Sequence, residues 1–222
     1  MPFLFPFGSF DFTKIIARSI VFIIAIVVHE YAHGIVAYKL GDPTAKYAGR
    51  LSLNPLSHLD VIGAVCLIVF GFGWAKPVPI NPMYFKDRKR DSAWVSLAGP
   101  LANIMLALLF TVLIGVYWAY SPAHFTGTSG FITILLEQLV ATNVGFAVFN
   151  LIPIPPLDGS KILGAFLSNS AYYRYMRYEH FGFPLLIILS VTGVLGSFLQ
   201  MFIVPICNGL SYLAMYVCTL FM

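Results

Sequence analysis

Charged residues are scarce in this chain of 222 residues, and that scarcity excludes an ordinary soluble globular protein. Only 10% of the residues are Asp, Glu, Lys or Arg, whereas 59% are hydrophobic, and the mean hydropathy is +0.85. A soluble domain of this size could not cover its surface with so few charges. The composition therefore predicts an integral membrane protein.

Cysteine is rare as well, and its placement excludes two common frameworks. The chain has three cysteines, Cys66, Cys207 and Cys218, all in apolar surroundings. Their spacing matches neither a zinc cluster nor a disulfide framework.

Basic residues are missing from 1–13, which therefore lacks the charged region of a signal peptide, so we expect the first apolar span to be retained.

Long apolar runs fill most of the chain and predict its fold. Transmembrane helices are expected at about 15–40, 93–120, 131–152 and 183–205, because each run can cross a hydrocarbon core of about 30 Å. An apolar helix is expected over 206–222. Because 183–222 has no charged residue, one span plus an interfacial helix and a tight two-span hairpin both fit that tail.

A shorter apolar run at 61–74 contains three glycines and is too short to span, so we expect a re-entrant or hairpin segment there. The predicted fold class is an all-α polytopic membrane protein. We expect a single domain over 1–222, built as a bundle of about four to five transmembrane helices plus this short segment.

Basic residues gather between the apolar runs and predict the orientation. The stretches 76–91 and 158–180 are rich in Lys and Arg, whereas 121–130 has none. By the positive-inside rule the first two are cytoplasmic and the third is outside. This bias also explains the net charge of +4 better than nucleic acid binding does.

Three ionisable side chains, His29, Glu30 and His33, interrupt the first apolar run in an H-E-x-x-H pattern. On a helix, positions i and i+4 share a face, so both imidazoles can hold one metal ion. Glu30 would project beside that metal, where it can take a proton from a bound water. Ionisable groups at membrane depth are costly and indicate function. The motif would lie about 10 to 16 Å from the cytoplasmic end of its helix.

A third metal ligand must come from another segment, because catalytic zinc sites usually use three protein ligands. Glu137 lies near the outer end of the span 131–152, and Asp158 lies just past its inner end. Their separation is about 30 Å along a helix, so both cannot match the depth of His33. Prolines after Ile152 break the helix and Gly159 permits a sharp turn, which favours Asp158.

Three signatures in this order resemble those of a known family. Residues 29–33 read H-E-Y-A-H, 99–103 read G-P-L-A-N, and 150–159 read N-L-I-P-I-P-P-L-D-G. The second and third are similar to G-x-x-x-N and N-x-x-P-x-P-x-L-D-G. The chain thus resembles the site-2 protease family of intramembrane zinc metalloproteases, in a minimal form without a PDZ or CBS domain.

The resemblance implies that His29, His33 and Asp158 bind zinc and that Glu30 is the general base and acid. It also implies that Asn150 and Asn103 lie near the site and orient the substrate or its oxyanion. The implied substrate is the transmembrane helix of a membrane protein, cleaved in regulated intramembrane proteolysis. The implied location is a bacterial or archaeal cytoplasmic membrane, with the active site toward the cytoplasmic side and with lipid, not nucleic acid, around it.

Simpler roles remain open for several of these residues. The pair Gly99 and Asn103 also fits a close helix contact between small residues, and Asn150 fits a cap before the proline break. His58 and Asp60 fit an interfacial loop better than the site. A non-hydrolytic membrane adaptor or transporter is the alternative function, since intramembrane polar groups also mark ion pathways.

Overall fold

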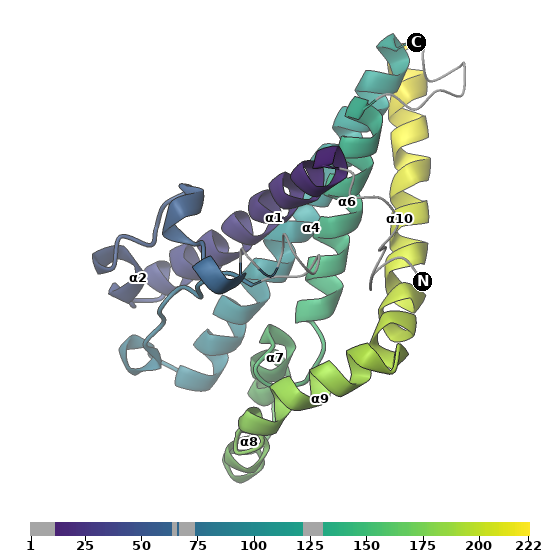
Figure 1. The fold of residues 1–222 in the computed structure, drawn as a ribbon. Coiled ribbons are helices and arrows are strands. Elements are labelled where there is room, and N and C mark those ends of the chain that lie inside the picture. Colours follow the sequence, from purple (N-terminus) through teal and green to yellow (C-terminus); the bar gives the residue numbers. More distant parts are fainter. Residues whose placement is uncertain (1–11, 64–65, 67–73, 122–130) are drawn as a thin grey trace.

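The computed structural model describes residues 12–63, 66, 74–121 and 131–222, and this part of the chain is mainly helical. Four of its helices are long and apolar enough to cross a membrane (Figure 1). They are α1 (Phe12–Lys39), α4 (Arg88–Tyr120), α6 (Phe131–Asn150) and α10 (Val194–Phe221). The predicted class, an all-α polytopic membrane protein, is confirmed.

Helix α4 lies at the centre of the bundle, where it packs against α1, α6, α7 and α10. Small and β-branched residues fill the contact between three of the long helices. This core cluster consists of Ala107 and Ile114 of α4, Val140 and Val144 of α6, and Ala214 of α10. At Gly115 an added Cβ would lie 2.5 Å from the carbonyl oxygen of Ala214, so the backbones of α4 and α10 are in close contact there.

Short elements, α2 (Thr44–Tyr47), η1 (Pro55–Ser57) and η2 (Pro82–Tyr84), join α1 to α4. The buried carboxylate of Asp42 ties this connection together, accepting from the backbone N–H groups of Thr44 at 2.9 Å and Asn81 at 2.7 Å. An isolated bridge pairs Leu59 with Ala75 and brings the ends of the intervening segment together. Most of the predicted re-entrant run 61–74 lies outside the described residues, and that prediction is not tested.

The chain reverses direction after α6 and enters α7 (Asp158–Phe166) and α8 (Asn169–Met176). The reversal depends on Gly159, where an added Cβ would lie 2.2 Å from the carbonyl oxygen of Leu151. Only glycine allows the start of α7 to pass this close to the end of α6. Asp158 is thereby folded back toward the bundle.

The C-terminal boundaries differ from those expected. In place of a span at 183–205 and a second helix at 206–222, α9 (Glu179–Val191) comes first and α10 follows as one long span. Gly193 separates them with a φ of 76°, a left-handed conformation that ends helices and favours glycine. The tail has no charged residue from 183 to 222, so charge carried no sign of the break. Figure 1 shows α9 running from α8 to the base of α10.

Candidate metal centre

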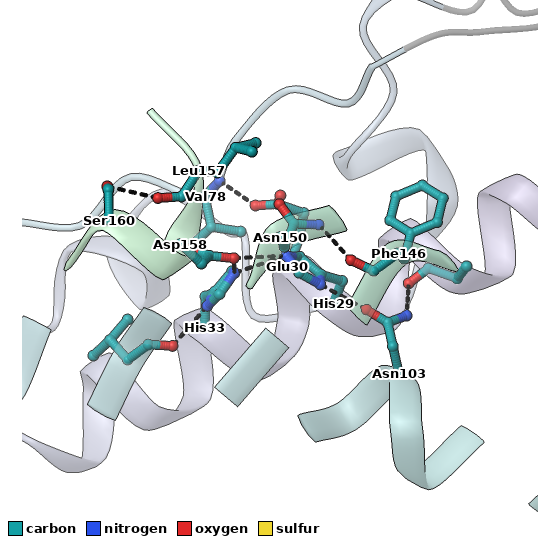
Figure 2. Close-up of polar contacts among 12 residues, drawn as sticks. His29, Glu30, His33, Val78, Asn103, Phe146, Asn150, Leu157, Asp158 and Ser160 are labelled. Carbon is teal, nitrogen blue, oxygen red and sulfur yellow. Dashed lines mark hydrogen bonds and ion pairs between the residues drawn. The ribbon is translucent and has the colours of Figure 1, made fainter. Parts of the chain in front are cut away.

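Two histidines of α1 and the first residue of α7 meet inside the bundle (Figure 2). The Nε2 atoms of His29 and His33 lie 2.9 Å apart. The Oδ2 atom of Asp158 lies 3.2 Å from Nε2 of His29 and 3.1 Å from Nε2 of His33. Both histidines are almost fully buried, with exposed fractions of 4% and 6%. The structure therefore brings together the three residues that sequence reasoning selected as ligands.

Helix α4 fixes the other nitrogen of each ring. Nδ1 of His29 lies 2.7 Å from Oδ1 of Asn103, and Nδ1 of His33 lies 2.7 Å from the carbonyl oxygen of Val95. A carbonyl oxygen can only accept, so each Nδ1 carries the proton and donates. In the neutral ring the lone pair then belongs to Nε2, and both Nε2 atoms point at Asp158.

Three acceptor atoms thus converge without a proton donor among them, which is the chemistry of a cation site. A tetrahedral zinc with bonds of about 2.0–2.1 Å holds neighbouring ligand atoms about 3.3 Å apart, close to the observed separations. The residues present therefore fit a zinc ion.

Gly99 leaves the room in which the two rings sit. A Cβ added at this position of α4 would lie 2.5 Å from Nε2 of His33 and 2.6 Å from Cε1 of His29. Gly99 lies midway between Val95 and Asn103, at intervals of four residues, so all three share one face of the helix. One face of α4 therefore provides both ring acceptors and the space between them.

The carboxylate of Glu30 is held by a different segment. Its Oε2 atom accepts a hydrogen bond of 2.8 Å from the backbone N–H of Val78. Val78 stands between Pro77 and Pro79, which have no N–H group, so it is the one backbone donor in this tripeptide. Arg50 also holds this segment by donating to the carbonyl oxygens of Lys76 and Pro77.

The other expected residues occupy varied places. Asn150 ends α6 and donates 3.0 Å to the carbonyl oxygen of Phe146 in its own helix. The side-chain oxygen and nitrogen of Asn103 both form hydrogen bonds to protein groups, including His29. Glu137 lines a cavity of about 240 Å³ between α4, α6 and α10 and is not part of the cluster. His58 is buried in the loop, where it donates to the carbonyl oxygen of Ser52.

A model of a protein family, described as Peptidase family M50, matches residues 17–133 and 119–191. The chain belongs to this family. M50 relatives include "Putative zinc metalloprotease YwhC" of Bacillus subtilis, 39% identical over 81% of each chain. "Putative zinc metalloprotease MJ0611" of Methanocaldococcus jannaschii is 29% identical over 72% of this chain and 76% of its own. No solved structure matches.

Membership of the M50 family confirms the resemblance to site-2 proteases and makes the chain a zinc metallopeptidase. A third relative agrees with this, "Putative zinc metalloprotease Rip2" of Mycolicibacterium smegmatis, 31% identical over 78% of this chain and 66% of its own. With four apolar helices of spanning length, this M50 peptidase is an integral membrane protein.

Sequence reasoning missed three contributors to the site of this M50 protein. Val95 acts through its carbonyl oxygen and Val78 through its N–H, and no side-chain pattern reveals either. Asn143 bonds to Asn103 from α6. It was visible as an uncharged polar residue in the middle of an apolar span, but it belongs to no recognised motif.

Proposed function

We propose that His29, His33 and Asp158 hold the zinc ion, and that the protein hydrolyses peptide bonds within or near the transmembrane segments of other membrane proteins. The observation that carries this proposal is the convergence of three acceptor atoms, 2.9 to 3.2 Å apart, inside a bundle of membrane-spanning length. Glu30 follows the first ligand directly and is the group that moves protons.

When bound, zinc acidifies a water and polarises the scissile carbonyl. Glu30 takes a proton from the attacking water as the water oxygen forms a bond to the carbonyl carbon. Glu30 then gives the proton to the departing nitrogen as the C–N bond breaks. Val78 keeps the carboxylate in place during both transfers.

Asn150 is the proposed donor to the oxyanion. Its side-chain amide has two N–H hydrogens and bonds through one to Phe146, so the second is available for substrate. Asn103 is instead assigned to the orientation of His29, since its amide is already engaged by protein groups.

The proposed site faces the cytoplasm. Every Lys and Arg after position 18 lies in the segments that join or extend the site end of the bundle, from Lys39 to Arg177. This bias predicts a cytoplasmic location for that end. The bacterial and archaeal relatives suit a cytoplasmic membrane, and regulated proteolysis of a membrane-anchored protein is the proposed context.

The test uses purified protein in lipid vesicles with a tagged single-span substrate whose apolar helix carries a Gly-Pro break. The same substrate without the break is its control, because an intact helix shields its peptide bonds. Glu30→Gln should slow cleavage by about 10²- to 10⁴-fold, the usual contribution of a general base, with zinc content unchanged. Product termini from mass spectrometry should fall in or beside the apolar segment. Cleavage that survives Glu30→Gln, or that occurs only in soluble flanks, contradicts the proposal.

A further inference from the structure

A chain of buried amides leads from α6 through α4 to the metal centre on α1. Asn143 of α6 donates from Nδ2 to the carbonyl oxygen of Leu139 at 2.8 Å. Its Oδ1 atom accepts from Nδ2 of Asn103 at 2.8 Å. Oδ1 of Asn103 faces Nδ1 of His29 at 2.7 Å. Asn103 and Asn143 both have an exposed fraction of 0%.

The direction of every hydrogen bond in this chain is fixed by its far end. The carbonyl oxygen of Leu139 can only accept, so Asn143 must present its N–H₂ group to Leu139 and its oxygen to Asn103. Asn103 must then present N–H₂ to Asn143, which leaves its oxygen for His29.

A second carbonyl holds the same orientation. Nδ2 of Asn103 also donates to the carbonyl oxygen of Ala25 at 3.0 Å, one turn before His29 on α1. Asn103 therefore forms hydrogen bonds to two successive turns of α1, and both bonds require the same placement of its oxygen and nitrogen atoms.

We infer that Asn143 and Asn103 form a relay that sets the tautomer of His29, keeping the proton on Nδ1 and the lone pair on Nε2 before zinc arrives. This inference rests on the proposed metal site. A flipped Asn103 would face Nδ1 with an N–H₂ group and favour the tautomer that cannot bind zinc through Nε2. Asn143 is a positioning residue, since it reaches the metal only through Asn103 and His29.

The relay makes zinc affinity depend on a residue of α6 that touches no ligand. Partners outside the ligand set typically change metal affinity by about 10- to 100-fold. Asn143→Leu should weaken zinc binding by about tenfold, the lower end of that range, because Asn103 still keeps its bond to Ala25. Asn103→Leu should lie nearer the upper end, since it removes the acceptor itself.

Two further variants separate the relay from general packing. Asn143→Asp keeps an oxygen for Asn103 and, as a carboxyl kept neutral by burial, a donor for Leu139, so it should restore most of the affinity. Thr111→Val is the matched control. Thr111 is a buried polar residue of α4 that donates only within its own helix, 2.8 Å to Ala107, and its loss should leave zinc affinity unchanged.

Zinc affinity is measured by chelator competition on monodisperse full-length protein, and ¹⁵N spectra of ring-labelled histidine in the metal-free protein report the tautomer. The wild type should show His29 protonated at Nδ1, identified by its absence in His29→Ala, and Asn143→Leu should show a mixture. If Asn143→Leu does not stay folded, the smaller Asn143→Ala makes the same test.

Wild-type affinity and an unchanged tautomer in Asn143→Leu would overturn the relay. Equal weakening in Asn143→Leu and Asn143→Asp would overturn it too, because a general packing defect would then explain both. Unchanged zinc affinity in His29→Ala would instead contradict the proposed metal site, which is a different result.

Discussion

Gly99 shows at the scale of a single residue how closely α4 approaches the two histidines. An alanine here suits a helix better than glycine does. Its methyl group, however, would lie 2.5 Å from the ring of His33 and 2.6 Å from the ring of His29. Overpacking of this kind costs about 1–3 kcal/mol, and the rings must move to relieve it. Gly99→Ala should therefore weaken zinc binding about tenfold or more, measured by chelator competition.

Gly196 provides the control for that substitution. It also lies in a helix, but an added Cβ would meet nothing within 4 Å. Gly196→Ala should keep wild-type zinc affinity. Equal zinc affinity in Gly99→Ala and Gly196→Ala would mean that the rings do not occupy the position described.

The residues that could be predicted are those whose chemistry appears in their side chains. His29, Glu30 and His33 follow from spacing on a helix, and Asp158 follows from depth and from the breakers around it. Asn103 was expected beside the site, yet its bond to the back of His29 could not be predicted, since it depends on how α1 and α4 pack. Asn143 required the packing of a third helix.

At the scale of elements, the extended tripeptide 77–79 matters because its prolines leave one N–H group. Val78→Pro removes that donor from Glu30 while touching no zinc ligand. A hydrogen bond to a charged group is worth about 1.5–3 kcal/mol, so kcat should fall by about tenfold to a hundredfold with zinc content unchanged. The measurement is the turnover of the vesicle-bound substrate.

Val78→Ala keeps the N–H group and loses only side-chain packing, which makes it the matched variant. Its kcat should stay well above that of Val78→Pro. If the two variants turn over substrate equally, the backbone donor has no part in holding Glu30.

The elements also show where the sequence signal ended. Proline and glycine after α6 predicted a break and a turn. The prolines have no N–H group to continue the helix, and the backbone contact at Gly159 is the physical reason for the turn. In the tail, Gly193 is one of several glycines in an uncharged sequence, and its left-handed conformation marks the boundary. Hydropathy predicts that a span exists but not where one helix stops in such a run.

At the scale of the whole molecule, the orientation in the membrane is the proposal most open to test. Tyr47 lies in α2 at the site end, and Tyr120 ends α4, about 50 Å along the helix from Arg88. Both side chains are exposed, at 84% and 71%. Single cysteines at these positions, in a background with serine at the native cysteines and normal zinc content, should label differently with a membrane-impermeant maleimide.

We expect Tyr47→Cys to react from the cytoplasmic side and Tyr120→Cys from the other side, in vesicles of opposite orientation. The basic segments near the site end are the reason. The reverse pattern would move the proposed site toward the outer face, and the substrate would then be cut from that side.

The fold class could be predicted from composition, because a chain with 59% hydrophobic and 10% charged residues cannot cover the surface of a soluble protein. The way the spans pack could not be predicted, since lipid-facing and helix-facing positions are both largely apolar. The central place of α4 emerges only from the structure, and it explains why one helix provides the acceptors for both histidine rings.

Zinc content per chain tests the central claim most directly, measured on purified wild-type protein and on His33→Ala, Asp158→Ala and Glu137→Ala. Wild type and Glu137→Ala should each hold about one zinc, whereas the other two variants should lose it, because three ligands are needed to hold the ion. Retention of zinc by Asp158→Ala, or its loss from Glu137→Ala, would contradict the assigned metal centre.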